Sequence, residues 1–168
     1  MVDAGLIRAE SIELSPLDLA EGLRAGLVTA STVVQVACDA YAKNCTDPVI
    51  AELTYLLSDQ LDEVPRILGL KTSSDESACP SANMRSIRKW LYLEMKAIYV
   101  SRDRRPHLWD DIADLYCDFD HPESIADLVP WMPLKPGQEA GEAAMMRRLE
   151  VFLREEHELL VHVRACND

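Results

Sequence analysis

The feature that most constrains the fold is a long helical spacing of apolar residues in the middle of the chain. Between residues 81 and 101, apolar side chains recur three or four positions apart, at Ile87, Trp90, Leu91, Met95, Ile98 and Tyr99. This spacing places the side chains on one face of an α-helix. We therefore expect a helix from about Ser81 to Ser101 that buries this face.

Helix start signals recur along the rest of the chain. Ser15 and Asp47 each precede a proline, an arrangement in which the polar side chain caps the helix and the proline takes its first position. Further helices are expected over residues 106–117, 122–129 and 138–165. No stretch alternates between apolar and polar residues as a strand does. The predicted fold class is all-α, either a single-domain multi-helix bundle or a short α-α superhelix of about eight helices.

Two irregular segments interrupt this pattern within one domain, which is expected to span residues 1–168. Residues 71–83, KTSSDESACPSAN, are small and polar and predict a surface loop. Residues 130–137 are rich in proline and predict a series of turns. A short helix is also expected near Ser58, with a bend or break at Pro65.

The chain is strongly acidic, with a formal net charge of −12 over 168 residues. This charge gives no general attraction to the phosphates of nucleic acids or anionic membranes, so we expect neither as a partner. It favours encounter with a basic protein, although many soluble proteins are acidic only to remain in solution. No signal peptide or membrane-spanning stretch is visible, which predicts a cytoplasmic protein.

Motifs that carry enzyme chemistry are missing from the sequence. It has no Gly-rich phosphate loop, no Gly-x-Ser-x-Gly elbow and no Cys-x-x-Cys pair among its five cysteines. Cys38 and Cys45 lie seven positions apart on a predicted helix, which favours two small buried side chains. We therefore expect a non-enzymatic protein with reduced thiols and no cofactor. The sequence does not determine the oligomeric state.

Negative charge is concentrated in residues 106–133, which carry seven acidic and no basic residues, directly after a basic segment at 71–105. Asp111, Asp114 and Asp118 lie three and four positions apart, so they share one helix face, where like charges repel. This face either pairs with the basic segment or remains available to a positively charged partner. The side chains predicted to contact a partner are Asp110, Asp111, Asp114, Tyr116, Asp118, Asp120 and Trp131.

The end of the same segment offers a second hypothesis, a metal site formed by Asp118, Asp120 and His121. Carboxylates and imidazole suit Mg²⁺, Mn²⁺, Fe²⁺ or Zn²⁺. These three residues do not follow an established ligand pattern, and no Glu-x-x-His motif accompanies them. Asp120 or His121 can instead cap a helix that has Pro122 at its first position. We favour this structural interpretation.

Trp131 stands among prolines, between Pro130 and Pro133, on a segment that is not expected to be helical. A tryptophan in such a place is either a buried anchor for the loop or an exposed binding hot spot. The sequence favours the buried anchor.

Three segments together resemble a known protein family. They are IADLYCDFDHPESIADLVPWMP at 112–133, LSDQLDEVPRIL at 57–68 and RKWLYLEMKAIY at 88–99. The chain, from about Leu14 to Met132, resembles the uncharacterised bacterial proteins catalogued as domain of unknown function two-two-four-seven. The resemblance implies a candidate immunity protein for a secreted toxin. It carries no functional residues over to this chain.

The leading functional hypothesis is therefore a bacterial protein–protein interaction module, an immunity protein that neutralises a basic toxin domain. Its acidic residues would steer the encounter, and Trp131 or Tyr116 would supply apolar contact. One alternative is a metal-dependent helical enzyme that uses Asp114, Asp118, Asp120 and His121. Another is a helical-repeat scaffold.

Overall fold

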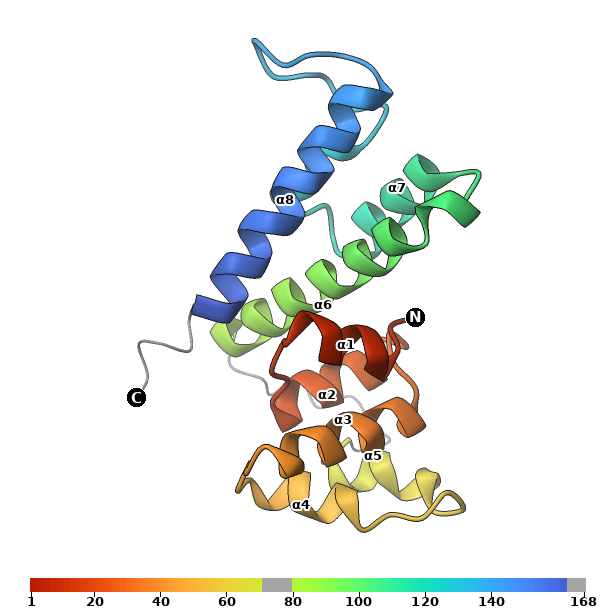
Figure 1. The fold of residues 1–168 in the computed structure, drawn as a ribbon, viewed down its shortest axis with the longest axis vertical. Coiled ribbons are helices and arrows are strands. Elements are labelled where there is room, and N and C mark those ends of the chain that lie inside the picture. Colours follow the sequence, from red (N-terminus) through yellow and green to blue (C-terminus); the bar gives the residue numbers. More distant parts are fainter. Residues whose placement is uncertain (71–79, 163–168) are drawn as a thin grey trace. The chain divides into compact units, whose positions relative to one another are not determined.

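The computed structural model describes residues 1–70 and 80–162, with side chains described for 1–70 and 84–161. Within these ranges the chain forms eight α-helices and three 3-10 helices and no strand, which confirms the predicted all-α class (Figure 1). Most of the loop predicted at 71–83 lies outside the described residues, and its last four residues already belong to a helix. Packing divides the chain into two units, Met1–Trp90 and Leu91–Asp168. The expected single domain stays a prediction.

The first unit is built around helix α3, Ala30–Ala42. The elements that contact α3 are α1 (Ala4–Glu10), α2 (Pro16–Arg24), α4 (Pro48–Thr54), η1 (Leu61–Glu63) and α5 (Val64–Ile67). Val33 and Ala37 of α3 are fully buried, as are Leu19 of α2 and Leu53 of α4. The apolar face of α3 thus lies at the centre of this unit. The predicted burial of Cys38 was wrong, because its side chain is exposed beside that face.

Side-chain caps start the helices of this unit, as the Ser-Pro and Asp-Pro pairs predict. Asp47 accepts hydrogen bonds from the backbone N–H groups of Val49 and Ile50, and Pro48 begins α4. Asp3 caps α1, a seven-residue helix that the sequence analysis did not anticipate. Pro65 does not bend a helix. It lies in the first turn of α5, where its missing N–H has no helical partner to lose, so the predicted bend was wrong.

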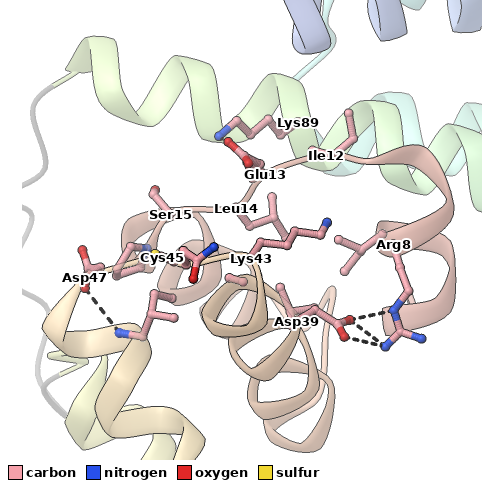
Figure 2. A pocket seen from close by; sticks show the side chains of 16 residues that line it. Arg8, Ile12, Glu13, Leu14, Ser15, Asp39, Lys43, Cys45, Asp47 and Lys89 are labelled. Carbon is pink, nitrogen blue, oxygen red and sulfur yellow. Dashed lines mark hydrogen bonds and ion pairs between the residues drawn. The ribbon is translucent and has the colours of Figure 1, made fainter. Parts of the chain in front are cut away.

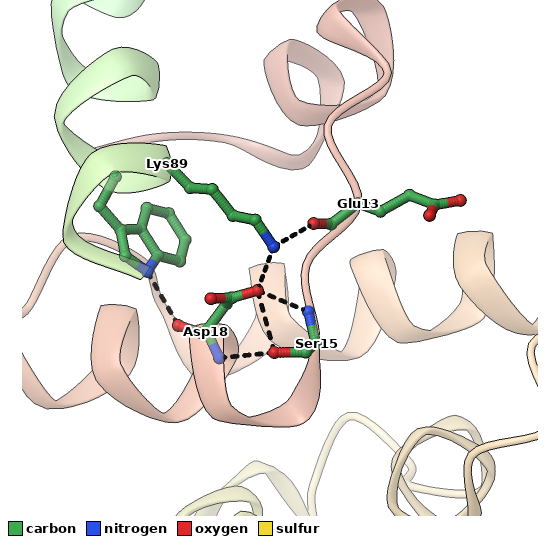
Figure 3. A network of polar contacts seen from close by, with 5 residues as sticks. Glu13, Ser15, Asp18 and Lys89 are labelled. Carbon is green, nitrogen blue, oxygen red and sulfur yellow. Dashed lines mark hydrogen bonds and ion pairs between the residues drawn. The ribbon is translucent and has the colours of Figure 1, made fainter. Parts of the chain in front are cut away.

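The start of α2 is tied to the long helix α6, Pro80–Val100, by a part-buried polar network centred on the buried Asp18 (Figure 3). Ser15 and Asp18 form a reciprocal capping box, and Asp18 Oδ2 also accepts a hydrogen bond from Lys89 Nζ at 2.6 Å. Lys89 donates a second bond to the Glu13 carbonyl, at 2.9 Å. Trp90 Nε1 donates to the Asp18 carbonyl at 2.8 Å. Asp18 of α2 and Glu13 of the segment before it thus position the first half of α6.

Gly22 lets the Trp90 ring pack directly on α2. A Cβ atom added at Gly22 would overlap the six-membered part of the indole ring. Trp90 is almost completely buried, and its N–H has the partner that a buried indole requires. The close contact therefore depends on the missing side chain of Gly22.

The second unit consists of the rest of α6 followed by η2 (Arg102–Arg104), α7 (Leu108–Asp118), η3 (Glu123–Leu128) and α8 (Glu142–His162). η3 contacts both α7 and α8, and its Ile125 and Leu128 are buried. Helix α8 begins four residues later than predicted, because Gly141 has a left-handed backbone that ends the preceding turn. The predicted helix end at 165 lies outside the described residues.

The predicted helix at 81–101 is confirmed as α6, but its buried face is wider than the apolar spacing indicates. Tyr92 and Leu93 are fully buried in addition to Trp90 and Met95. Ile87 was expected on the buried face and is instead 42% exposed. Within the described residues, no helix combines the length and apolar character that spanning a membrane requires.

Candidate functional site

Helix α7 separates apolar and acidic residues onto different faces. Leu108, Ile112 and Leu115 are buried, as predicted. Asp110, Asp114 and Asp118 are exposed, and Asp111 is half-buried. Asp110 and Asp111 lie in the first turn, where the helix dipole favours negative charge. This dipole contributes nothing to Asp114 and Asp118 farther along the helix.

The basic segment before α7 neutralises only part of this acidic face. Arg105 Nη1 lies 2.6 Å from Asp111 Oδ2, and the same guanidinium donates to Ser101 Oγ. Asp114 and Asp118 have no ion-pair or hydrogen-bond partner for their carboxylates within the part of the chain that the structure describes. Of the three aspartates that share this helix face, only Asp111 is therefore paired with the basic segment in the described part of the chain.

The corner after α7 is formed by two consecutive residues in the left-handed region. Asp120 has φ 58° and His121 has φ 60°, and the His121 N–H donates to the Tyr116 carbonyl. This geometry ends α7 in the manner of a Schellman motif. The prediction that Asp120 or His121 caps the next helix was wrong, because η3 starts at Glu123 with Pro122 as its N-cap residue and without a side-chain cap.

Two aromatic rings meet at this corner. His121 packs edge-on against the Tyr116 ring, with centroids 4.9 Å apart, and its Nδ1 is 3.9 Å from Asp120. No group of three His, Cys, Asp or Glu residues in the described ranges has the geometry of a metal site. Tyr116 is 7% exposed, so its ring stabilises the corner from inside and is not presented to a partner.

Trp131 is 61% exposed, which makes the predicted buried anchor wrong. It lies in the predicted turn-rich segment, which the structure confirms between η3 and α8. Hydrogen bonds from α8 and from the loop itself hold this segment. Arg148 donates to the carbonyls of Asp127 and Glu139, and Gln138 donates to the Asp127 carboxylate. Trp131 is thus an exposed ring on a loop that is fastened at both ends.

The first unit contains a pocket that the sequence analysis missed (Figure 2). It lies between the segment that joins α1 to α2 and the end of α3, and its volume is about 490 Å³. The charged residues of its lining come from distant parts of the sequence, namely Arg8, Glu13, Asp39, Lys43, Asp47 and Lys89. No local motif could have indicated it, because these residues lie on several elements that only the folded chain brings together.

Comparison with known proteins places the chain in a family. Residues 5–157 match the family described as "Uncharacterized protein conserved in bacteria (DUF2247)". No curated protein and no solved structure matches the chain. The matched region extends at both ends beyond the segment from Leu14 to Met132 that carries the resemblance in sequence. The chain therefore belongs to the bacterial DUF2247 family.

Proposed function

We propose that this protein is a non-enzymatic interaction module that binds and neutralises a basic toxin domain, as an immunity protein does. The observation that carries the proposal is the uncompensated charge of Asp114 and Asp118 on the exposed face of α7. Like charges one turn apart repel each other, so a helix gains no stability from this arrangement. A positively charged partner surface would offset the repulsion between the two carboxylates and would be attracted to both of them.

The acidic face and the exposed tryptophan have different tasks in this mechanism. Asp110, Asp114 and Asp118 raise the rate of encounter with a basic surface, because long-range attraction acts before contact. Trp131 contributes apolar area, and a tryptophan on a fastened loop loses little conformational entropy when it is covered. Asp111 is already paired with Arg105, so it contributes less to binding than its two neighbours.

The direct test is protection of cells against the product of a neighbouring gene. The C-terminal domain of each adjacent reading frame is expressed from an inducible promoter, with and without this protein. We expect one of these domains to be basic and toxic, and growth to recover when this protein is present. Purified proteins should then form a complex on size-exclusion chromatography. If neither neighbouring product is toxic or bound, the assignment as an immunity protein is wrong.

Two variants separate the proposed surface from the overall charge of the chain. Asp114→Asn with Asp118→Asn removes two charges from α7, and Asp59→Asn with Asp62→Asn removes two exposed charges from the first unit. We expect the first pair to weaken protection and the second pair to leave it intact. Equal effects of the two pairs would show that net charge, and not this surface, controls binding.

A further inference from the structure

The pocket of the first unit has an apolar floor beneath a polar rim (Figure 2). Ile7, Leu14, Val36 and Ile50 line it, and each is buried in the surrounding core. A volume of about 490 Å³ lies within the range of pockets that hold small molecules. Apolar walls with a few polar groups are the usual composition of such pockets. The shape and lining therefore suit an organic molecule with an apolar body.

Most charges at the rim are already neutralised. Arg8 Nε and Nη2 bind both carboxylate oxygens of Asp39, with the shortest contact at 2.6 Å. Lys89 is paired with Asp18. Asp47 directs one oxygen at the first N–H groups of α4, whose dipole favours its negative charge. These groups shape the rim, and pairing has reduced their attraction for a ligand.

Lys43 is different, because its ammonium group has no ion-pair or hydrogen-bond partner among the residues with described side chains. Its side chain lies between Leu14 and Asp39 in Figure 2, over the pocket that all three line. The neighbouring Asn44 has a left-handed backbone at φ 66°, which ends α3, and its side-chain amide also has no partner in the described part of the chain. One cation and one amide donor are thus available at the same edge.

We propose that this pocket binds a small carboxylate whose apolar body lies on the floor formed by Leu14, Val36 and Ile50. Lys43 would pair with the carboxylate, and the Asn44 amide would donate a second hydrogen bond to it. Every residue of this site belongs to the first unit, whereas α7 belongs to the second. Binding at this site goes beyond the proposed neutralisation of a toxin, because it gives the protein a small-molecule ligand.

The test compares three probes that share an eight-carbon chain: octanoate, octylammonium and octanol. Each is titrated into the ¹⁵N-labelled protein, below the micelle concentration of the two charged probes and below the solubility limit of octanol, and amide chemical shifts are recorded. We expect octanoate to give saturable shifts at Leu14, Ser15, Asn44 and Cys45. Octylammonium should bind about tenfold more weakly, because a charged hydrogen bond is replaced by repulsion. Equal affinities for the three probes would overturn the proposal, because they would show only apolar adsorption.

Two pocket variants and one matched control complete the experiment. Lys43→Gln should weaken octanoate about tenfold and leave octanol unchanged. Lys135→Gln, which removes an exposed lysine from the second unit, should change neither. Ala40→Phe fills the pocket and should abolish the saturable shifts, while circular dichroism checks its fold. Octanoate binding that is unaltered by Lys43→Gln, or no saturable shift in the wild type, would overturn the proposal.

Discussion

A single carboxylate organises the start of α2 and its contact with α6. Asp18 Oδ2 accepts hydrogen bonds from the Ser15 backbone N–H, the Ser15 hydroxyl and Lys89. Its side chain is 5% exposed and that of Lys89 is 24% exposed, so water screens this ion pair only weakly. The carboxylate therefore combines a local helix cap with a contact 71 positions away in the sequence.

Replacing Lys89 with methionine should destabilise the protein by about 3 kcal/mol, because a buried carboxylate loses its counter-ion while the apolar stem is kept. The measurement is urea unfolding followed by circular dichroism. Arg66→Met is the matched control, since Arg66 pairs with Glu63 on an exposed surface, and it should cause no measurable change. An unchanged unfolding midpoint for Lys89→Met would show that this network does not stabilise the fold.

Tyr99 gives a second prediction for a single residue. Its hydroxyl donates a hydrogen bond to Glu150 at 2.9 Å, and this bond, with partial burial and the nearby negative charge of Glu150, raises the pKa of Tyr99 above its usual 10.0. A pKa raised by folding stabilises the folded state at pH values below 10, and this contribution is lost as pH rises through the folded pKa. Tyr99→Phe should therefore be less stable than wild type at neutral pH.

The pH dependence distinguishes this hydrogen bond from simple packing of the ring. The difference in unfolding free energy between wild type and Tyr99→Phe should be constant up to about pH 9 and shrink above pH 10. Parallel urea titrations of both proteins at several pH values measure it. A difference that persists unchanged at high pH would assign the effect to the ring environment.

At the scale of the helices, Gly22 shows how a tertiary contact overrides the helix propensity that favours alanine over glycine. In a solvent-exposed helix, Gly→Ala stabilises by about 1 kcal/mol. In α2 the added Cβ would overlap the Trp90 ring, so we expect Gly22→Ala to destabilise by about 2 kcal/mol through overpacking. Urea unfolding measures the change. In a Trp90→Phe background the smaller ring should reduce the penalty, and an equal penalty in both backgrounds would exclude this contact as the cause.

The helices that could be predicted from the sequence are those with strong local signals. Ser15 and Pro16 mark the start of α2, and Asp47 and Pro48 mark that of α4, because capping involves only neighbouring residues. The apolar spacing likewise predicted α6 within one residue at each end. Helix α1 was missed, because it has only seven residues and its stability comes from contact with α3.

Features that depend on tertiary contact could not be predicted. The apolar spacing of α6 predicted that Ile87 is buried and missed the burial of Tyr92. When a helix is covered on more than one side, its buried residues no longer recur only at every third or fourth position. Asp120 and His121 adopt left-handed backbones that their residue types allow but do not require. The pocket beside Lys43 depends on residues up to 82 positions apart, from Ile7 to Lys89.

For the whole molecule, the central question is whether the net charge of −12 serves solubility or recognition. Acidic side chains that serve only solubility can lie anywhere on the protein surface. In this chain Arg105 neutralises Asp111 while Asp114 and Asp118 stay uncompensated next to it. Two exposed carboxylates in the first unit, Asp59 and Asp62, provide an internal standard for charge without a proposed role.

The most direct measurement is the rate of association with the basic toxin domain, as a function of ionic strength, in stopped-flow experiments. Asp114→Asn with Asp118→Asn should lower this rate about fivefold at low salt and flatten its salt dependence, since steering acts over about a Debye length. Asp59→Asn with Asp62→Asn should retain the wild-type rate and slope. The same rate and slope for wild type and the α7 variant would contradict recognition through this face.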